Sequence, residues 1–343
     1  MFFRKKKEKC KYEGRWASHL PLYKCPRPAL PGEDCCIFHS EDIKGKKAEF
    51  DKAFWKEFKT KRKQGKGYDF MGFIFPGDVS FGGKTFEKAV SFYKAIFHGK
   101  TLFSGTTFKE AAIFEGAEFK DVNPNNETSY AGFGGAQFLK GVNFFGVVFP
   151  RDTDFSNAEF VGEAIFWLAK FPGKVNFRDT IFTGNVNFQG THFCLLANAG
   201  EKSIDFKVDF ENTQFFGRVS FFSANFYGNA KFWANKFKGI TDFSHSTFHK
   251  DVEFNAAKFT GEVAGFLKTT FSGKTTFIGV KFYCDVDFVK IIIGDNAQFK
   301  MIRTYLSDVT GLFEYIEADR KKKRKNGSSR IPGIPGKLFF YIA

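Results

Sequence analysis

The sequence predicts an all-β solenoid, a rod of short stacked strands, over residues 67–300. Three observations support this prediction. Most of the 52 Phe of the 343-residue chain fall on one lattice whose steps alternate between five and six residues. A small or β-branched residue stands two places before nearly every lattice Phe. The residues between are rich in Gly, Thr, Asn, Asp and Val, which disfavour long helices.

The stretch "FPRDTDFSNAEFVGEAIFWLAKFPGKVNFRDTIF", residues 149–182, shows the pattern at its most regular. Neither the helix period of about 3.6 nor the strand period of 2 produces it. An 11-residue period can indicate a right-handed helical supercoil, but Pro76, Pro150 and Pro172 would break long helices. In an extended segment, residues two apart point to the same face. The small residue and the Phe of each segment are therefore both expected to point inward.

The lattice is interrupted in three places. We expect a protruding loop between Phe119 and Phe133. Between Phe193 and Phe210, either Ala199 and Ile204 hold lattice places or a loop brings Phe206 inward. One extra residue between Phe259 and Phe266 predicts a bulge at Gly265. In the longer steps, Gly often follows Phe closely and is expected at a positive φ or a bulge, as at Gly99, Gly162, Gly173, Gly184, Gly217, Gly228 and Gly239.

Residues 1–42 are expected to form a small metal-binding module. The segment is rich in Pro and Gly and offers Cys10, Cys25, Cys35, Cys36 and His39. Three thiolates and one imidazole favour tetrahedral Zn²⁺, and four protein ligands leave no open position, so the zinc would be structural. The alternative is ordinary reduced thiols beside one surface His. The residues alone do not decide between Cys35 and Cys36.

Residues 43–66 predict an amphipathic α-helix. Phe50, Phe54 and Phe58 recur at every fourth position, with Lys, Asp and Glu around them. A solenoid exposes open sheet edges at its ends and needs caps. We therefore expect this helix to cover the first turn of the rod.

Residues 301–343 predict an imperfect last coil followed by a basic disordered tail. Tyr305 and Ile316 fit a last coil, and "RKKKRK" at 320–325 precedes a segment of turn-forming residues. The basic run could bind nucleic acid or anionic lipid, although a solvated tail is the simpler interpretation.

The net charge of +15 lies at the two ends of the chain, and residues 67–300 are balanced. No run approaches the ~18 apolar residues of a membrane-spanning helix, and the N-terminus lacks an apolar stretch of signal-peptide length. We therefore expect a cytoplasmic protein with no integral membrane segment. The sequence leaves the oligomeric state open.

Residues 68–300 resemble the pentapeptide-repeat family, in its Phe-centred variant with alternating five- and six-residue steps. The resemblance implies a right-handed quadrilateral β-helix in which four successive segments make one coil and the rod has about ten coils. Family members similar to this chain carry a short Cys/His module that ends in C-x-x-H. This implies that Cys36, rather than Cys35, joins Cys10, Cys25 and His39 as a zinc ligand.

The sequence predicts a non-catalytic protein, because no convincing nucleophile–base grouping appears. The first hypothesis is a scaffold that binds an unidentified protein partner through the faces of a rigid rod. The alternative is nucleic-acid binding through the basic zinc module and the basic C-terminal tail. Some members of the resembled family mimic duplex DNA and bind type II topoisomerases. That mechanism requires an acidic rod. Because the repeats carry no net charge, DNA mimicry is the third hypothesis.

Overall fold

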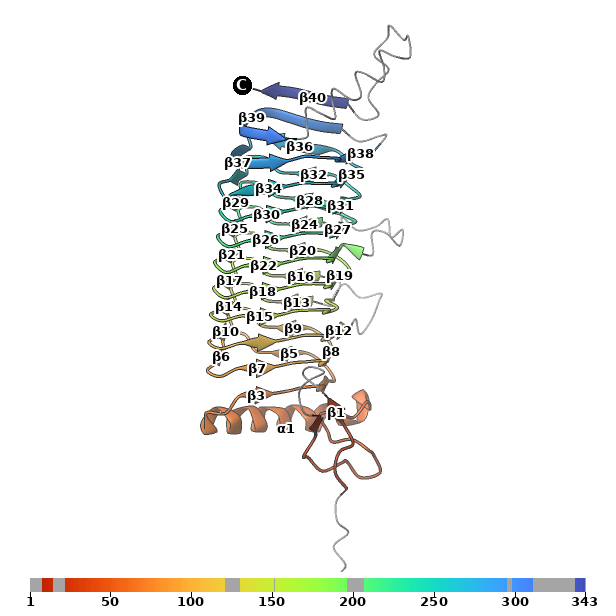
Figure 1. Cartoon of the computed structure of the whole chain (residues 1–343). Helices are drawn as coiled ribbons and strands as arrows, with labels where there is room; N and C mark the ends of the chain where they lie inside the picture. The colour runs from red at the N-terminus through yellow and green to blue at the C-terminus, as the bar shows by residue number, and fades with distance from the viewer. Residues whose placement is uncertain are drawn as a thin grey trace, which may run out of the picture.

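The computed structural model describes residues 8–14, 22–120, 130–150, 152–195, 207–294, 298–310 and 337–342, with side chains as far as residue 294. Short strands stack in parallel rows along a rod, and one helix lies across the N-terminal end (Figure 1). The rod is a β-solenoid of about nine turns, close to the ten that the Phe lattice predicts. The fold class is thus confirmed.

Each turn contributes a strand to each of four faces. Face 1 consists of β5 (Val79–Ser80), β9 (Thr101–Leu102), β13 (Tyr130–Gly132), β16 (Asp152–Asp154), β20 (Val175–Asn176), β24 (Lys207–Asp209), β28 (Asn229–Lys231), β32 (Val252–Glu253) and β36 (Thr275–Ile278). Face 2 consists of β6 (Thr85–Phe86), β10 (Thr107–Phe108), β14 (Gln137–Phe138), β17 (Glu159–Phe160), β21 (Ile181–Phe182), β25 (Gln214–Phe215), β29 (Lys236–Phe237), β33 (Lys258–Phe259) and the start of β37 (Lys281–Asp287).

The other two faces complete the rectangle. Face 3 consists of β3 (Tyr68–Asp69), β7 (Val90–Ser91), β11 (Ala112–Ile113), β15 (Val142–Asn143), β18 (Ala164–Ile165), β22 (Val186–Asn187), β26 (Val219–Ser220), β30 (Thr241–Asp242) and β34 (Val263–Gly265). Face 4 consists of β4 (Ile74–Phe75), β8 (Ile96–His98), β12 (Glu118–Lys120), β19 (Lys170–Phe171), β23 (His192–Phe193), β27 (Asn225–Phe226), β31 (Thr247–Phe248), β35 (Thr270–Phe271) and β38 (Ile292–Ile293).

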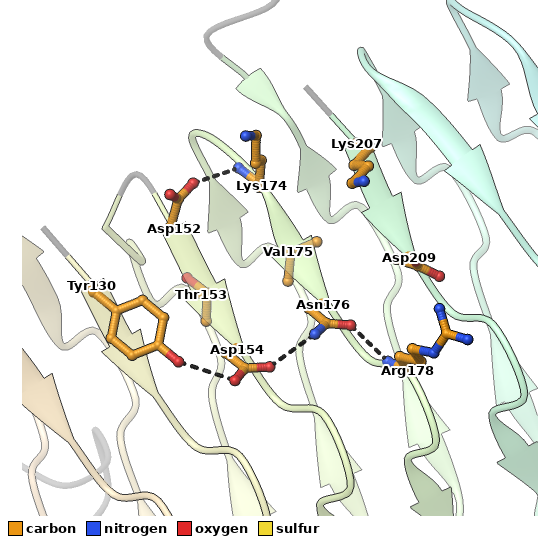
Figure 2. A pocket seen from close by; sticks show the side chains of 10 residues that line it. All are labelled: Tyr130, Asp152, Thr153, Asp154, Lys174, Val175, Asn176, Arg178, Lys207 and Asp209. Carbon is orange, nitrogen blue, oxygen red and sulfur yellow. Dashed lines mark hydrogen bonds between the residues drawn. The ribbon is translucent and has the colours of Figure 1, made fainter. Parts of the chain in front are cut away.

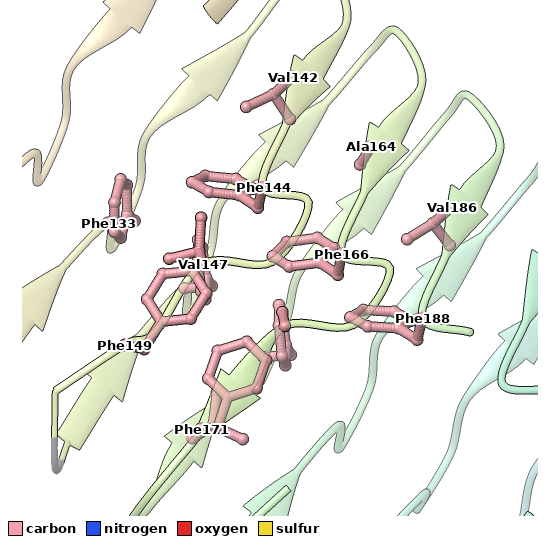
Figure 3. Close-up of a cluster of buried hydrophobic side chains, with 14 of the residues drawn as sticks. Phe133, Val142, Phe144, Val147, Phe149, Ala164, Phe166, Phe171, Val186 and Phe188 are labelled. Atoms are coloured by element: carbon pink, nitrogen blue, oxygen red, sulfur yellow. The ribbon is translucent and has the colours of Figure 1, made fainter. Parts of the chain in front are cut away.

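The lattice Phe form the core of the rod. Phe108 pairs with Phe86, four lattice steps earlier, so one turn returns each Phe to the place above its predecessor. Along the rod the rings stack nearly parallel: Phe144 and Phe166 have centroids 4.9 Å apart and planes 18° apart (Figure 3). Across the interior the rings meet edge to face, as Phe155 and Phe166 do at 90°. Both arrangements are favoured by the ring quadrupole.

The small residues two places before each Phe also point inward. Ala95, Ala117 and Ala164 are completely buried, as the pattern predicts. Several of these places hold Thr, whose hydroxyl donates to a backbone carbonyl of the previous turn; Thr106 Oγ1 donates to Phe81 O at 2.8 Å. The hydrogen bond compensates for burying the hydroxyl.

The register explains the first two interruptions. Phe138 pairs directly with Phe108, although the chain between them is longer than the four steps of an ordinary turn. Phe226 pairs with Phe193 across a similarly long segment. In both turns the stacking of Phe on Phe therefore continues across the longer segment. The expected loop at 121–129 and the alternatives at Ala199, Ile204 and Phe206 fall outside the described residues.

The third interruption corrects the expected bulge. Phe259 pairs with Phe237 in the ordinary register, whereas Ala264 pairs with Thr241 and is shifted by one position from that register. The extra residue therefore enters between Phe259 and Ala264. Gly265 itself pairs in register with Asp242, so the prediction of a bulge at Gly265 is wrong.

The glycines of the longer steps also differ from the prediction. Only Gly99, at φ 127°, has positive φ among the seven that the sequence singles out. Positive φ instead occurs two residues after every second lattice Phe. These positions hold Gly83 and Gly105, but also Asn157 and Ala256. Gly184 is needed for another reason: a Cβ there would lie 2.4 Å from the carbonyl oxygen of Gly162.

Helix α1 (Ile43–Gln64) covers the first turn, as predicted. Asp42 Oδ1 accepts a hydrogen bond from Gly45 N, which caps the first turn of the helix, and Gly65 ends it in a left-handed conformation. Phe54 packs against Phe70 and Phe75, with centroids 5.0 and 5.1 Å apart. The helix thereby continues the aromatic core of the rod beyond the exposed edge of the first turn.

At the other end, β39 (Gln298–Thr310) pairs in parallel with β36 and β37, and it contains Tyr305, as a last coil predicts. Strand β40 (Lys337–Ile342) pairs with β39, so the prediction of disorder is wrong for these residues. Their sequence, "KLFFYI", is rich in β-forming residues, and the open edge of β39 provides backbone partners. Ile316 and the basic run at 320–325 lie outside the described residues.

Within the part of the chain that the structure describes, no helix combines the length and the apolar character needed to cross a bilayer.

Candidate metal centre

Four side chains that the sequence analysis singles out converge at the N-terminal end of the rod. The ligand atoms of Cys10, Cys25, Cys36 and His39 all lie within 4.8 Å of one another, and all four residues are buried. No other group of three or more potential ligands gathers within the described residues.

Backbone pairing places the four groups. Cys10 N donates to Arg27 O at 2.9 Å and Cys25 N donates to Tyr12 O at 3.0 Å, so two antiparallel segments hold these cysteines side by side. The short strands β1 (Glu13–Gly14) and β2 (Tyr23–Lys24) continue this pairing. Cys36 and His39 lie on one turn, in which His39 N donates to Cys36 O at 2.9 Å.

The distances fit a tetrahedral zinc site. With Zn–S bonds of about 2.3 Å and a Zn–N bond of about 2.05 Å, tetrahedral geometry requires S···S of about 3.8 Å and S···N of about 3.5 Å. Cys25 Sγ and Cys36 Sγ lie 3.8 Å apart, and His39 Nδ1 lies 3.5 and 3.4 Å from the sulfurs of Cys10 and Cys36. A disulfide would need about 2.05 Å between the sulfurs.

His39 is held with one nitrogen toward the sulfurs. Its Nε2 lies 2.9 Å from the carbonyl oxygen of Met71 and can only donate to it, which leaves a lone pair on Nδ1. The ring of Tyr12 stacks on the imidazole at 3.9 Å, and Phe73 contacts it edge to face. Such outer contacts typically orient a metal-binding His. Because Met71 belongs to the first turn, His39 also ties the module to the rod.

Cys35 is not one of the four clustered groups, although its thiol interacts with that of Cys10. It is only partly buried, and its backbone carbonyl accepts a hydrogen bond from Leu30 N at 2.8 Å. Burial raises the pKa of the Cys35 thiol to about 11. The structure therefore brings Cys36, rather than its neighbour, to the other three groups.

Two cations, the partly buried Arg27 and the buried Lys46, lie around the sulfurs. Arg27 Nη1 donates to Cys25 Sγ at 3.6 Å, and the same guanidinium donates through Nε to Glu57 of α1 at 3.1 Å. Lys46 of α1 is 4% exposed and donates through Nζ to the carbonyl of Ser40; burial lowers the pKa of Lys46 to about 8. Three thiolates around Zn²⁺ carry a net charge of −1, which these cations would offset.

Cys25 Sγ and Cys36 Sγ lie 3.8 Å apart, within hydrogen-bonding distance for sulfur. Their mutual hydrogen bond lowers the pKa of Cys25 to about 3 and raises that of Cys36. One thiolate is thus already favoured by the protein, and a metal ion would favour deprotonation of the others.

The sequence analysis missed the outer contacts Tyr12, Arg27, Lys46 and the Met71 carbonyl. Tyr12 and Arg27 each follow a cysteine by two residues, so the period of an extended strand could have placed them on the same face. The helix residue Lys46 and the carbonyl of Met71 approach the four clustered side chains only through tertiary packing. The sequence contains no comparable signal for them.

A second concave site is an open groove of about 440 Å³ on face 1 (Figure 2). Several of its polar groups pair with one another: Tyr130 Oη donates to Asp154 Oδ2 at 3.0 Å, and Asn176 Nδ2 donates to Asp154 Oδ1 at 3.1 Å. Asp and basic residues balance along it, and no nucleophile–base pair is formed there. The lining residues are Tyr130, Asp152, Thr153, Asp154, Lys174, Val175, Asn176, Arg178, Lys207 and Asp209.

A comparison with known protein families matches part of the repeat. Residues 81–123 match the sequence model of a family described as pentapeptide repeats (9 copies). Among solved structures, the chain is similar to a trypsin-treated variant of QnrB1, a plasmid-mediated fluoroquinolone resistance protein, with 14% identity and a TM-score of 0.25. That alignment covers 74% of this chain and 99% of the other. None of the curated proteins matches the chain.

Proposed function

We propose that this chain is a pentapeptide-repeat protein that acts as a non-catalytic scaffold, whose rigid rod binds a protein partner and whose N-terminal end is closed by a structural zinc ion. The observation that carries the scaffold proposal is an exposed apolar patch on one side of the rod. We define it as the central patch, formed by Leu139, Phe145, Val161, Ile165, Trp167 and Leu168.

The central patch extends over neighbouring turns and around face 3. Leu139 and Val161 lie at one corner of this face and are 36% and 38% exposed, whereas Trp167 and Leu168 lie at the other corner, at 41% and 44%. Phe145 packs on Trp167 with centroids 5.1 Å apart.

Between these corners the outward positions of the strands are uncharged, although Lys140 and Glu163 are exposed at the first corner and Glu115 accepts a hydrogen bond from Asn143 Nδ2 at 3.0 Å. The outward positions of the face carry Ile113, Asn143, Ile165 and Asn187. Exposed apolar clusters with polar and charged residues at their margin are typical of protein interfaces. The patch therefore fits a protein partner with an apolar contact surface.

The scaffold proposal is tested with Trp167→Ser combined with Leu168→Ser. We expect this variant to fold like the wild type but to lose its partner in quantitative affinity purification. Ile292→Ser, which removes an exposed apolar side chain (54% exposed) from face 4, is the matched control and should retain the partner. Equal recovery of every bound protein by the wild type and the central-patch variant would contradict the proposal.

The zinc proposal rests on the geometry of the metal centre. Cys10, Cys25 and Cys36 would supply thiolates and His39 would supply Nδ1, which fills four positions and leaves none for substrate. The zinc would cross-link the module, and His39 would transmit this order to Met71 of the first turn. We infer a structural role because a segment this small has few other means to hold its shape.

Two adjacent cysteines provide the test. Elemental analysis of the purified wild type should give about one zinc per chain. Cys36→Ala should abolish it, whereas Cys35→Ala should leave it unchanged. Absence of metal from the wild type, even after refolding with excess zinc, would overturn the proposal. Equal zinc in all three proteins would assign the metal to other residues.

A further inference from the structure

Three lysines lie in register on face 2 of the C-terminal half of the rod. Lys236 pairs directly with Lys258, and Lys258 pairs with Lys281. All three side chains are exposed. We define these three residues as the lysine ladder. Successive strands are about 4.8 Å apart, so the ladder places three like charges in a row along the rod.

The lysine ladder lacks the compensation that other lysines of the rod have. On the same side of the rod, Lys109 Nζ lies 2.8 Å from Glu87 Oε2. Among the described residues, no carboxylate oxygen lies within 4.0 Å of Nζ of Lys236, Lys258 or Lys281. Like charges directly opposite on neighbouring strands are unfavourable. An anionic partner that follows the rod axis would remove this repulsion.

Exposed aromatic side chains flank the lysine ladder on both corners of the face. Trp233 lies at one corner and is 37% exposed, and Phe216 and Tyr283 lie at the other, at 41% and 51%. Cations accompany two of these rings: Lys231 Nζ is 4.7 Å from the centroid of Trp233, and Lys238 Nζ is 3.9 Å from that of Phe216. Rings and cations thus lie close together on these turns.

We propose that this face binds single-stranded nucleic acid. The lysine ladder and Lys238 would contact consecutive phosphates, and Phe216, Trp233 and Tyr283 would stack on bases. A cationic track bordered by aromatic rings is the arrangement by which proteins bind single strands without sequence preference. In a duplex the bases are stacked on one another, so these rings would have no free base to contact. An acidic protein segment would satisfy the lysines but leave the rings unused.

The surface is separate from the features that carry the proposed function. It lies on face 2 near the C-terminal end, whereas the metal centre lies at the N-terminal end and the central patch surrounds face 3. The proposal therefore does not depend on zinc or on a protein partner.

The test is fluorescence anisotropy with labelled oligo-dT and oligo-U of about 12 nucleotides, over about 50–200 mM salt. The wild type should bind, with an affinity that falls as salt rises. In the triple variant Lys236→Gln, Lys258→Gln, Lys281→Gln, the slope of log K against log salt should shrink by about 2, since each phosphate contact contributes about 0.7. Comparing the two oligonucleotides shows whether DNA or RNA is preferred.

A charge-matched control separates this face from the general basicity of the chain. The triple variant Lys109→Gln, Lys170→Gln, Lys174→Gln loses the same charge elsewhere on the rod and should keep most of the affinity. The variant Phe216→Leu, Trp233→Leu keeps every charge and should bind about tenfold more weakly or worse, because each stacked base is lost.

Three results would overturn the proposal. Wild-type protein that binds neither oligonucleotide at low salt would exclude it. Equal weakening by the lysine-ladder and control variants would assign binding to the overall charge or to the basic ends. Binding of polyglutamate that competes fully with the oligonucleotides, together with no effect of the aromatic substitutions, would assign the face to an acidic protein.

Discussion

Asn235 is an exception to the pattern of small and β-branched residues in the interior of the rod. It is completely buried at a position that holds Thr in several other turns. Its Nδ2 donates to Phe210 O at 2.6 Å and to Thr213 O at 3.2 Å. Its Oδ1 has no hydrogen-bond partner among the described residues. A buried acceptor without a partner destabilises a fold by about 1–3 kcal/mol.

Replacing Asn235→Thr should therefore stabilise the protein by about 1 kcal/mol. The hydroxyl can donate to Phe210 O as Thr106 donates to Phe81 O, and the unpaired oxygen is removed. The change is measured as the shift in urea unfolding. Asn235→Val, which has the shape of Thr without its hydroxyl, is the control and should be less stable than Asn235→Thr. A lower unfolding midpoint for Asn235→Thr than for the wild type would contradict this account.

The metal centre illustrates at the residue scale how far sequence reasoning reaches. Ligand chemistry and C-x-x-H spacing sufficed to select Cys10, Cys25 and His39, and the structure gathers them. The choice of Cys36 over Cys35 came from a family resemblance, because adjacent residues differ in direction only once the backbone of the turn is known. Zinc itself stays a prediction.

At the element scale, the turns between faces depend on two kinds of position. Gly162, Gly184, Gly217 and Gly239 follow one another along one corner, and each backbone closely approaches the next. Positions such as Ala256, at φ 55°, instead adopt left-handed backbone with an ordinary side chain. At the closely approaching glycines there is no room for a methyl group. At the left-handed positions, removal of the side chain would relieve backbone strain.

Two opposite substitutions on neighbouring turns distinguish these positions. Gly239→Ala should destabilise the rod by about 1–3 kcal/mol, because the new Cβ would lie 2.2 Å from the carbonyl oxygen of Gly217. Ala256→Gly should stabilise it by up to about 1 kcal/mol, since relief of left-handed strain exceeds the entropy cost of Gly. Urea unfolding of both variants measures the effects. Stabilisation by Gly239→Ala together with destabilisation by Ala256→Gly would contradict this account, because these are the signs expected if Gly acted only through the entropy of the unfolded chain.

At the scale of the whole molecule, the metal centre and α1 together close one end of a continuous core. Cys10, Cys25, Cys36 and Phe38 belong to the same hydrophobic cluster as the rod Phe. Phe38 stacks on Phe73 at 4.5 Å, and its carbonyl accepts a hydrogen bond from Ile74 N at 2.8 Å. Packing thus continues across residue 42. The domain boundary that the sequence predicts there stays a prediction.

Removal of the proposed zinc should open this end and leave the rest of the rod intact. In a solenoid each turn contacts mainly its neighbours, so disorder in the module should reach only the first turns. After chelation, hydrogen exchange should accelerate in α1 and in β3 to β8, and remain slow from β20 to β34. Cys35→Ala without chelation is the control and should exchange like the wild type. Uniform acceleration along the rod would contradict this local coupling.

Local spacing was enough to predict the solenoid, the inward Phe, the buried small residues and the capping helix. The direction of a side chain follows from such spacing, which is five or six residues in the repeat and four in the helix. The three-dimensional arrangement decided the register across insertions, the close approach of Gly184 to Gly162, the strand at 337–342 and the alignment of the lysine ladder. These features depend on which segments lie one turn apart. The stacking of complete turns, rather than local conformational preference, determines which segments become neighbours.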